Sequence, residues 1–356
     1  MERLTIGLTH GDLNGVGYEV ILKAFDNEEL LDMCTPVIYG SPKAAIFHRN
    51  ACGLQTNFNV ISSATEAKEG QLNLLNCFGE EELAIDFGRS SAVAGRAAFV
   101  SLQRATSDLK SRQIDALVTA PINKHSIHSA EFPFPGHTEY LEQQLGAEGS
   151  DQALMILMSE QMRVALVTTH LPISQVASHV TEQAVGAKIR LLHHALCRDF
   201  LLSAPRIAVL SLNPHNGDEG LMGEEESAAI TPAIREAYAE GIHCFGPYAA
   251  DGFFGSGAYT HFDAILAMYH DQGLAPFKAL SMGAGVNFTA GLPFVRTSPD
   301  HGTAYDIAGK NQADPSSLRQ AIYAAIDITR RRAQYDAAHA HPLLKQYHEK
   351  RDAGER

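Results

Sequence analysis

The stretch DAILAMYHDQGLAPFK, residues 263–278, is the best starting point for interpreting the fold. Its first part, Ala264–Met268, is an apolar run typical of a buried strand. A turn with His270, Asp271 and a flexible glycine is expected directly after it. Open α/β sheets bind ligands at the carboxyl ends of their strands, so this turn is predicted to lie at a binding site. Lys278 follows closely enough to reach the same pocket.

Two other apolar runs also lead into a histidine. Arg163–Thr169 is followed by His170, and Arg206–Leu212 is followed within a few residues by His215. Imidazole is the commonest protein ligand for transition metals. A single histidine after a strand is usually an ordinary loop residue. Three of them at equivalent strand ends, with His270 as the third, predict one three-histidine metal site.

Composition limits the class of protein. With 356 residues, the chain is long enough for about two domains. Its net charge of −13 argues against nucleic acid or an anionic membrane as the main partner. No apolar run approaches the roughly 20 residues of a membrane span. The scattered cysteines form no CxxC pair and the N-terminus has no signal-peptide layout, so a cytoplasmic protein with reduced thiols is expected.

The order of the expected elements indicates an α/β fold. Strands alternate with helices, which predicts a mostly parallel sheet with helices on both faces. Joints near residues 121–136 and 291–299 divide the chain into two α/β lobes with the active site in the cleft between them. The predicted first lobe consists of 1–125 plus 295–356, and the second of 126–294.

Two turns could bind phosphate. The predicted strand Leu4–Thr9 leads into the glycine-rich turn His10–Glu19, which is either a binding loop or a plain strand–turn–helix corner. The proline-rich segment 132–136 leads into a helix that starts at His137. Thr138 could cap this helix, or both side chains could receive a phosphate at its N-terminus.

Several longer motifs together resemble one family. They are GDxxGxGxE, PINK, GHTE, TTHLP, NPHNGDEG, YHDQGLAPFK and GVNFTAGLPFVRTSPDHGTAYDIAG. With them the sequence resembles the 4-hydroxythreonine-4-phosphate dehydrogenase family of pyridoxal phosphate synthesis over nearly the whole chain. The HGTAxDIAG motif also resembles the adenine-side loop of isocitrate and isopropylmalate dehydrogenases. The resemblance therefore implies the two-lobed α/β/α fold of those enzymes.

The resemblance also implies roles for individual residues. Three histidines would hold a divalent metal: His170, His215 and His270. Five residues would bind the phosphorylated substrate: His137, Thr138, Lys278, Asn287 and Arg296. One loop would bind NAD or NADP: Asp300, His301, Gly302, Thr303 and Ala304. The family's sites lie at a homodimer interface, with both subunits contributing.

The implied reaction oxidises 4-phosphohydroxy-L-threonine to 2-amino-3-oxo-4-phosphooxybutanoate, which decarboxylates to 3-amino-2-oxopropyl phosphate. A metal on the hydroxyl would act as a Lewis acid, and imidazole ligands suit Zn²⁺, Co²⁺ or Mn²⁺ better than Mg²⁺. Lys278 is a candidate base or a charge that holds the substrate. Asp271 would orient an imidazole, and Asp251 is a weaker candidate for proton handling. The Arg296 fork matches phosphate or carboxylate.

The sequence departs from the family at its first loop, where His10, Leu13 and Tyr18 occupy the usual proline positions. Three other functions stay open. The first is oxidative decarboxylation of a four-carbon sugar-acid 4-phosphate of the threonate or erythronate type. The second is a metal-dependent hydrolase, which would not need the HGTAxDIAG loop. The third is a binding protein for a phosphorylated ligand without catalysis.

Overall fold

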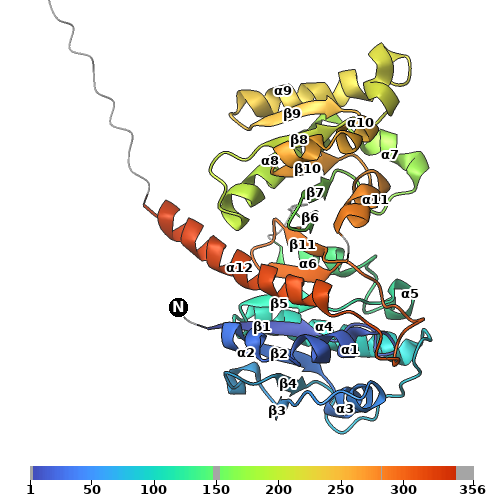
Figure 1. Cartoon of the computed structure of the whole chain (residues 1–356), viewed down its shortest axis with the longest axis vertical. Helices are drawn as coiled ribbons and strands as arrows, with labels where there is room; N and C mark the ends of the chain where they lie inside the picture. Colours follow the sequence, from blue (N-terminus) through green and yellow to red (C-terminus); the bar gives the residue numbers. More distant parts are fainter. Residues whose placement is uncertain (1–2, 147–152, 282, 342–356) are drawn as a thin grey trace, which may run out of the picture.

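The computed structural model describes residues 3–146, 153–281 and 283–341, and one sheet of twelve strands runs through this part of the chain (Figure 1). The polar, histidine-rich tail that the sequence indicates from Arg330 belongs to a helix as far as His339, and from residue 342 it lies outside the described residues. The strands are β1 (Leu4–Thr9), β2 (Cys34–Gly40), β3 (Asn59–Ile61), β4 (Asn73–Asn76), β5 (Ala116–Thr119), β6 (Leu154–Met158), β7 (Arg163–Leu166), β8 (Ile207–Leu210), β9 (Cys244–Tyr248), β10 (Ala264–Ala267), β11 (Val286–Ala290) and β12 (Val295–Pro299).

The strand order is β3-β4-β2-β1-β5-β12-β11-β6-β7-β10-β8-β9. The first six strands in this order, β3-β4-β2-β1-β5-β12, are parallel to one another. The last four, β7-β10-β8-β9, are also parallel to one another. Between these groups β12–β11, β11–β6 and β6–β7 pair antiparallel. Three reversals leave the two parallel groups running in opposite directions. The mostly parallel sheet is thus confirmed, with an antiparallel centre that was not predicted.

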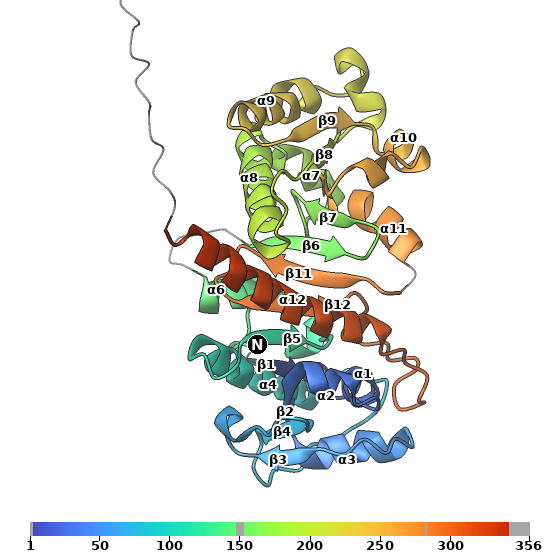
Figure 2. The same cartoon turned by 60° about the vertical axis from the view of Figure 1, so that its left-hand side comes forward.

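Helices flank both faces of the sheet (Figures 1 and 2). Several begin where a side chain caps the first turn, as Ser91 Oγ does for the Ala94 N–H. The α-helices are α1 (Gly17–Ala24), α2 (Glu29–Met33), α3 (Pro42–Ala51), α4 (Ala92–Lys110), α5 (Lys124–Ile127), α6 (His137–Leu145), α7 (Ile173–His179), α8 (Glu182–Asp199), α9 (Thr231–Ala239), α10 (Ala250–Gly255), α11 (His270–Ser281) and α12 (Ser316–His339). Shorter helical turns are η1 (Ala64–Glu66), η2 (Pro214–Gly220), η3 (Glu226–Ile230) and η4 (Ala258–His261).

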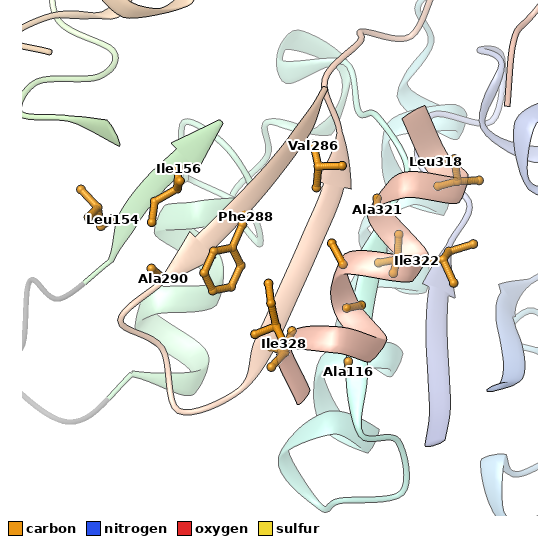
Figure 3. Packing of buried hydrophobic residues seen from close by; sticks show 14 of the residues in the cluster. Ala116, Leu154, Ile156, Val286, Phe288, Ala290, Leu318, Ala321, Ile322 and Ile328 are labelled. Atoms are coloured by element: carbon orange, nitrogen blue, oxygen red, sulfur yellow. The ribbon is translucent and has the colours of Figure 1, made fainter. Parts of the chain in front are cut away.

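The long helix α12 covers one face of the sheet centre. Figure 3 shows its residues Leu318 and Ile322 on the same side of the sheet as Val286 and Phe288 of β11. All four side chains are buried in the main apolar core. Alternate residues of a strand point to opposite faces, so the intervening positions of β11 and β12 face the other side of the sheet. The functional cavity lies on that other side.

Two ion pairs join α12 to α8. Arg332 Nε donates to Asp199 Oδ1 at 2.6 Å, and both side chains are buried. Arg332 Nη1 also donates to the Leu292 carbonyl at 3.0 Å. Nearby, Arg198 donates to Asp336 at 2.7 Å at a more exposed position. These pairs connect α12, in the predicted first lobe, to α8, in the predicted second lobe. The residue boundaries of the two lobes stay a prediction.

One local prediction was wrong, and one of two open alternatives is excluded. The expected turn after β10 is helix α11, which begins at His270. Its glycine, Gly273, permits close packing, because a Cβ there would lie 2.7 Å from Val164 Cγ1. Thr138 does not cap α6, because Gly136 is the N-cap residue and no side chain caps this end.

Candidate active site

A cavity of about 360 Å³ opens on the face of the sheet opposite α12. Strands β6, β11 and β12 form its floor, with Leu157, Asn287 and Arg296 facing inward. The ends of β5, β7 and β12 and the start of α11 form its walls. The remaining lining residues are Thr119, Pro121, Ile122, Lys124, Gly136, His137, Thr138, Glu139, Met155, His170, His270, Leu274, Lys278, Ser298, Pro299, Asp300, His301 and Gly302.

This cavity collects most of the predicted site residues. All five predicted substrate-binding residues line it, as do two of the three predicted metal ligands and three residues of the predicted cofactor loop. Thr303, Ala304, His215, Asp271 and Asp251 are not among its lining residues. Asp271 instead borders an adjacent cavity that it shares with His170 and His270.

Arg296 is a buried cation at the base of the cavity. Its Nε and Nη2 donate to Thr119 Oγ1 at 3.1 and 2.6 Å, and its Nη1 donates to Thr289 Oγ1 at 3.1 Å. Burial lowers its pKa to about 10, while Glu139 opposes this shift. Within the described residues no carboxylate forms an ion pair with it. A buried charge is costly without a partner, so the site is suited to receive an anion.

Other polar atoms in the cavity also lack partners within the described part of the chain. They are buried, and each belongs to a lining residue: His137 Nε2, Glu139 Oε2, Asn287 Oδ1 and His301 Nε2. Leaving such a group without a hydrogen bond costs about 1–3 kcal/mol. Burial, then the charges of Arg296 and Lys124, lowers the pKa of His137 well below its usual range, which keeps this imidazole neutral. A ligand with several polar groups would satisfy these atoms.

Two of the three predicted metal ligands face each other. The rings of His170 and His270 lie 6.1 Å apart between centroids. Asp271 Oδ1 lies 2.7 Å from His270 Nδ1, which is the orienting contact that the sequence predicted. Glu139 Oε1 lies 3.6 Å from His170 Nδ1, and this contact lowers the pKa of the Glu139 carboxyl. A carboxylate on one ring nitrogen leaves the other nitrogen for a ligand.

His215 lies apart from this pair. Strands β7, β10 and β8 are parallel neighbours, so the three histidines follow strands that end at the same edge of the sheet. His215 is nevertheless exposed, outside the cavity, and in a left-handed turn with φ 50°. Across residues 3–146, 153–281 and 283–341, no group of three His, Cys, Asp or Glu side chains is arranged to hold a metal ion. A three-histidine set is therefore not formed within the described chain.

Lys278 pairs with Asp300 at the edge of the cavity. Its Nζ lies 3.4 Å from both the carboxylate Oδ1 and the backbone carbonyl of Asp300. Burial raises the pKa of the Asp300 carboxyl, and Lys278 opposes that shift. An ammonium and a carboxylate are thus held together beside His270 and His301. Asp251, by contrast, is exposed on α10.

The glycine-rich turn after β1 is a packing corner. A Cβ on Gly15 would lie 2.8 Å from the Thr303 carbonyl oxygen, and one on Gly11 would collide with the Pro121 carbonyl. The Val16 N–H donates to that same Thr303 oxygen at 3.1 Å. These glycines allow backbone segments to approach each other. Of the two interpretations left open by the sequence, the structure supports the packing corner.

His10, Leu13 and Tyr18, which occupy the family's proline positions, make contacts that stabilise this corner. His10 stacks on Tyr18 with centroids 4.9 Å apart, and the Tyr18 hydroxyl accepts from the Ser41 N–H at 2.9 Å. His48 Nε2 lies 2.9 Å from the Leu13 carbonyl. Burial lowers the pKa of His10 to about 3 and that of His48 to about 4, so both rings are neutral at physiological pH. The three departures thus form part of one buried aromatic cluster.

Two residues of the cavity and one residue beside the end of β8 were not assigned a role from the sequence. Lys124 and Glu139 line the cavity, although both stand in motifs that the resemblance used. Glu226 is buried and accepts hydrogen bonds from the Leu212 and Asn213 N–H groups, which fixes the start of the segment that carries His215. Their partners lie on other elements, so sequence spacing gave no signal for these contacts.

The fold is that of an α/β enzyme, and its cavity holds a buried cation suited to a small anionic molecule. The family model "Pyridoxal phosphate biosynthetic protein PdxA" matches residues 32–325. The chain belongs to this family, and the resemblance found in the sequence is confirmed. It is therefore an oxidoreductase of the dehydrogenase type with the isocitrate/isopropylmalate dehydrogenase-like fold.

Individual relatives agree along nearly the whole chain. A 4-hydroxythreonine-4-phosphate dehydrogenase from Bacteroides thetaiotaomicron is 56% identical over 99% of this chain and 96% of its own length. A D-threonate 4-phosphate dehydrogenase from Cupriavidus necator is 39% identical over 92% of this chain and 98% of its own. The crystal structure of 4-hydroxythreonine-4-phosphate dehydrogenase from Klebsiella pneumoniae gives a TM-score of 0.79 at 33% identity, covering 92% and 98% of the two chains.

In the described residues, no helix combines the length and apolar character needed to cross a membrane.

Proposed function

We propose that this enzyme oxidises 4-phosphohydroxy-L-threonine with NAD or NADP to 2-amino-3-oxo-4-phosphooxybutanoate, which then loses CO₂. The observation that carries the proposal is the buried, unpaired Arg296 guanidinium among polar atoms that lack partners. A phosphorylated amino acid would supply an anion for Arg296 and hydrogen-bonding groups for His137 and Asn287. The name of the relative at 56% identity supports this substrate.

Binding and proton transfer fall to different parts of the cavity. The phosphate would lie on Arg296 and His137 with Thr138 and Asn287 around it, because all four side chains line the same cavity. Lys278 Nζ lies beside Asp300; as an ammonium it would hold a negative charge of the substrate, and only as a neutral amine would it take the proton from the substrate hydroxyl. Asp251 is the weaker candidate for proton transfer, because it is exposed on α10.

We propose that the segment Asp300–Ala304 binds the cofactor. His301 and Gly302 line the cavity, and the buried His301 Nε2 has no hydrogen-bond partner in the described part of the chain, which fits a ligand at this point. A nicotinamide cofactor would supply the hydride acceptor. A hydrolase would have no use for this loop, and a binding protein would not need the Lys278–Asp300 pair beside it.

A divalent metal remains part of the proposal. His170 and His270 would hold Zn²⁺, Co²⁺, Mn²⁺ or Mg²⁺, with His215 as the third ligand, and the metal would supply Lewis-acid chemistry. Within the described chain His215 does not meet the other two, so we route no step of the mechanism through the metal. Asp271 and Glu139 would orient the two facing imidazoles.

Replacing His270 by alanine should remove bound metal and turnover together, because the variant loses a ligand at the centre of the proposed set. Metal content after dialysis, measured by atomic absorption beside the NADH assay, checks this. His261→Ala, on the exposed turn η4, is the matched control and should keep both. Full activity of metal-free wild type would remove the metal from the proposal.

We also propose a homodimer with shared active sites in the cytoplasm. Ile173 is 72% exposed beside His170 in the adjacent cavity, and Leu221 is 81% exposed just after the His215 turn. Large apolar side chains exposed near a site are typical of a surface that a partner covers. All five cysteines are free thiols, which fits a reducing compartment.

The competing substrate is a four-carbon sugar-acid 4-phosphate, favoured by the relative named D-threonate 4-phosphate dehydrogenase. The two substrates differ in an amine or a hydroxyl beside the carboxylate. NADH formation should be measured with 4-phosphohydroxy-L-threonine and with D-threonate 4-phosphate, each with and without chelator. We expect a higher kcat/KM for the amino acid, and a reversed preference would assign the enzyme to the sugar acid.

A further inference from the structure

A buried carboxylate joins the corner after β1 to the proposed cofactor loop. Asp12 is 1% exposed, and its Oδ2 accepts hydrogen bonds from the Tyr305 hydroxyl at 2.9 Å and from Ser126 Oγ at 3.1 Å. Its Oδ1 accepts from the Asn14 N–H at 2.9 Å. No Lys or Arg among the described residues forms an ion pair with it. These contacts connect three separate segments, which carry Asn14, Ser126 and Tyr305.

We propose that Asp12 and Tyr305 are positioning residues that hold the segment Asp300–Ala304 in the shape that binds the dinucleotide cofactor. This inference rests on the proposed cofactor role of that segment. The two residues would act through the loop, since neither lines the cavity.

The loop needs such support because of its backbone conformation. Ala304 has a φ of 46°, in the left-handed region that is unfavourable for a residue with a Cβ. The residues on both sides of it are held by the corner after β1. Before it, the Thr303 carbonyl accepts from the Val16 N–H at 3.1 Å. After it, the Tyr305 hydroxyl donates to Asp12. Together these two contacts fix the turn.

The corner is itself well anchored. Asn14 Nδ2 donates to the Arg89 carbonyl at 2.7 Å, and its Oδ1 accepts from the Asp86 N–H at 2.9 Å. Gly88 lies against the Tyr305 backbone, where a Cβ would come within 2.7 Å of the carbonyl oxygen. Burial, then Asp12, raises the pKa of Tyr305 to about 12, so its hydroxyl keeps the proton that it donates. The support for the loop is therefore a connected, buried network.

The test is the affinity of the whole enzyme for NADH, measured by fluorescence titration without substrate. Tyr305→Phe removes one hydroxyl and keeps the ring. We expect the Kd for NADH to rise about 10-fold, the size of effect typical for one lost hydrogen bond to a carboxylate. The KM for NAD should rise in parallel. The kcat at saturating NAD and the KM for the phosphorylated substrate should stay within about 2-fold, because Tyr305 does not line the cavity that is proposed to bind this substrate.

Three further variants separate positioning from general stability. Asp12→Asn, which weakens the same contact, should also raise the Kd for NADH. Ser126→Ala removes another donor to the same Asp12 oxygen from a segment outside the cofactor loop and should leave the Kd unchanged. Tyr238→Phe, at a side chain 57% exposed on α9, is the surface control.

Each outcome decides the inference. A weaker NADH affinity for Tyr305→Phe with unchanged kcat supports it. Equal NADH affinity of wild type and Tyr305→Phe overturns it while leaving the cofactor site in place. A wild type that binds no NADH overturns it together with the proposed cofactor site. A Tyr305→Phe protein that loses kcat, both KM values and thermal stability together would show a merely structural role and also overturn it.

Discussion

Arg296→Ala is expected to raise the KM for the phosphorylated substrate by about 100-fold, which corresponds to roughly 3 kcal/mol for a charge-assisted contact. The guanidinium is buried, and within the described chain it bonds only to the hydroxyls of Thr119 and Thr289. It therefore has no protein anion to release when substrate arrives. Its loss should affect binding far more than folding, because the folded protein no longer has to bury an unpaired charge.

Initial rates over a wide range of substrate, beside urea unfolding, would measure both effects. Arg296→Lys keeps a charge but loses the two-pronged geometry, so its KM should lie between those of wild type and Arg296→Ala. Arg319→Ala, on α12 away from the cavity, is the control and should keep the wild-type KM. An unchanged KM for Arg296→Ala would exclude this residue from the substrate pocket.

Arg332→Ala is expected to lower the free energy of unfolding by about 3–5 kcal/mol, because it leaves Asp199 buried without its partner. Both members of this pair are less than 10% exposed, at 7% and 3%. The same arginine also donates to the Leu292 carbonyl, which would lose that hydrogen bond. Urea denaturation followed by circular dichroism checks the size of the effect.

The neighbouring pair gives a matched control. Arg198 and Asp336 join the same two helices at the surface, so Arg198→Ala should cost no more than about 1 kcal/mol. The double variant Asp199→Leu with Arg332→Met should recover most of the stability lost by Arg332→Ala, because apolar side chains leave no buried charge. Equal losses for Arg332→Ala and Arg198→Ala would contradict the role given to burial.

Local patterns predicted the elements well. β1 was predicted at its observed bounds, and α6 was predicted to start at His137, as observed, because prolines and apolar runs mark such boundaries. The direction of the central strands was not predicted. Leu154–Met158 and Val286–Ala290 are buried apolar strands whether they pair parallel or antiparallel. Their reversal depends on the connections between elements, which residue periodicity does not encode.

The family motifs predicted the residues that line the cavity. The spacing of residues along the sequence did not predict the contacts that hold these residues and their loops in place. The five predicted substrate-binding residues came from the resemblance, and all of them line one cavity. The contact of Asp12 with Tyr305 spans 293 positions, and no local pattern connects them. His215 was predicted from its place after a strand, yet it lies exposed in a left-handed turn after β8 and does not line the cavity that His170 and His270 line. Strand ends fix an edge of the sheet but not the path of the next loop.

The antiparallel centre of the sheet limits how the enzyme can admit its substrate. β6 and β11 are hydrogen-bonded to each other and to the strand groups on either side, so the backbone is continuous in hydrogen bonding across the base of the cleft. A wide hinge opening would break this ladder. Access to the cavity should instead vary through the twist of the sheet and through the loops at the rim.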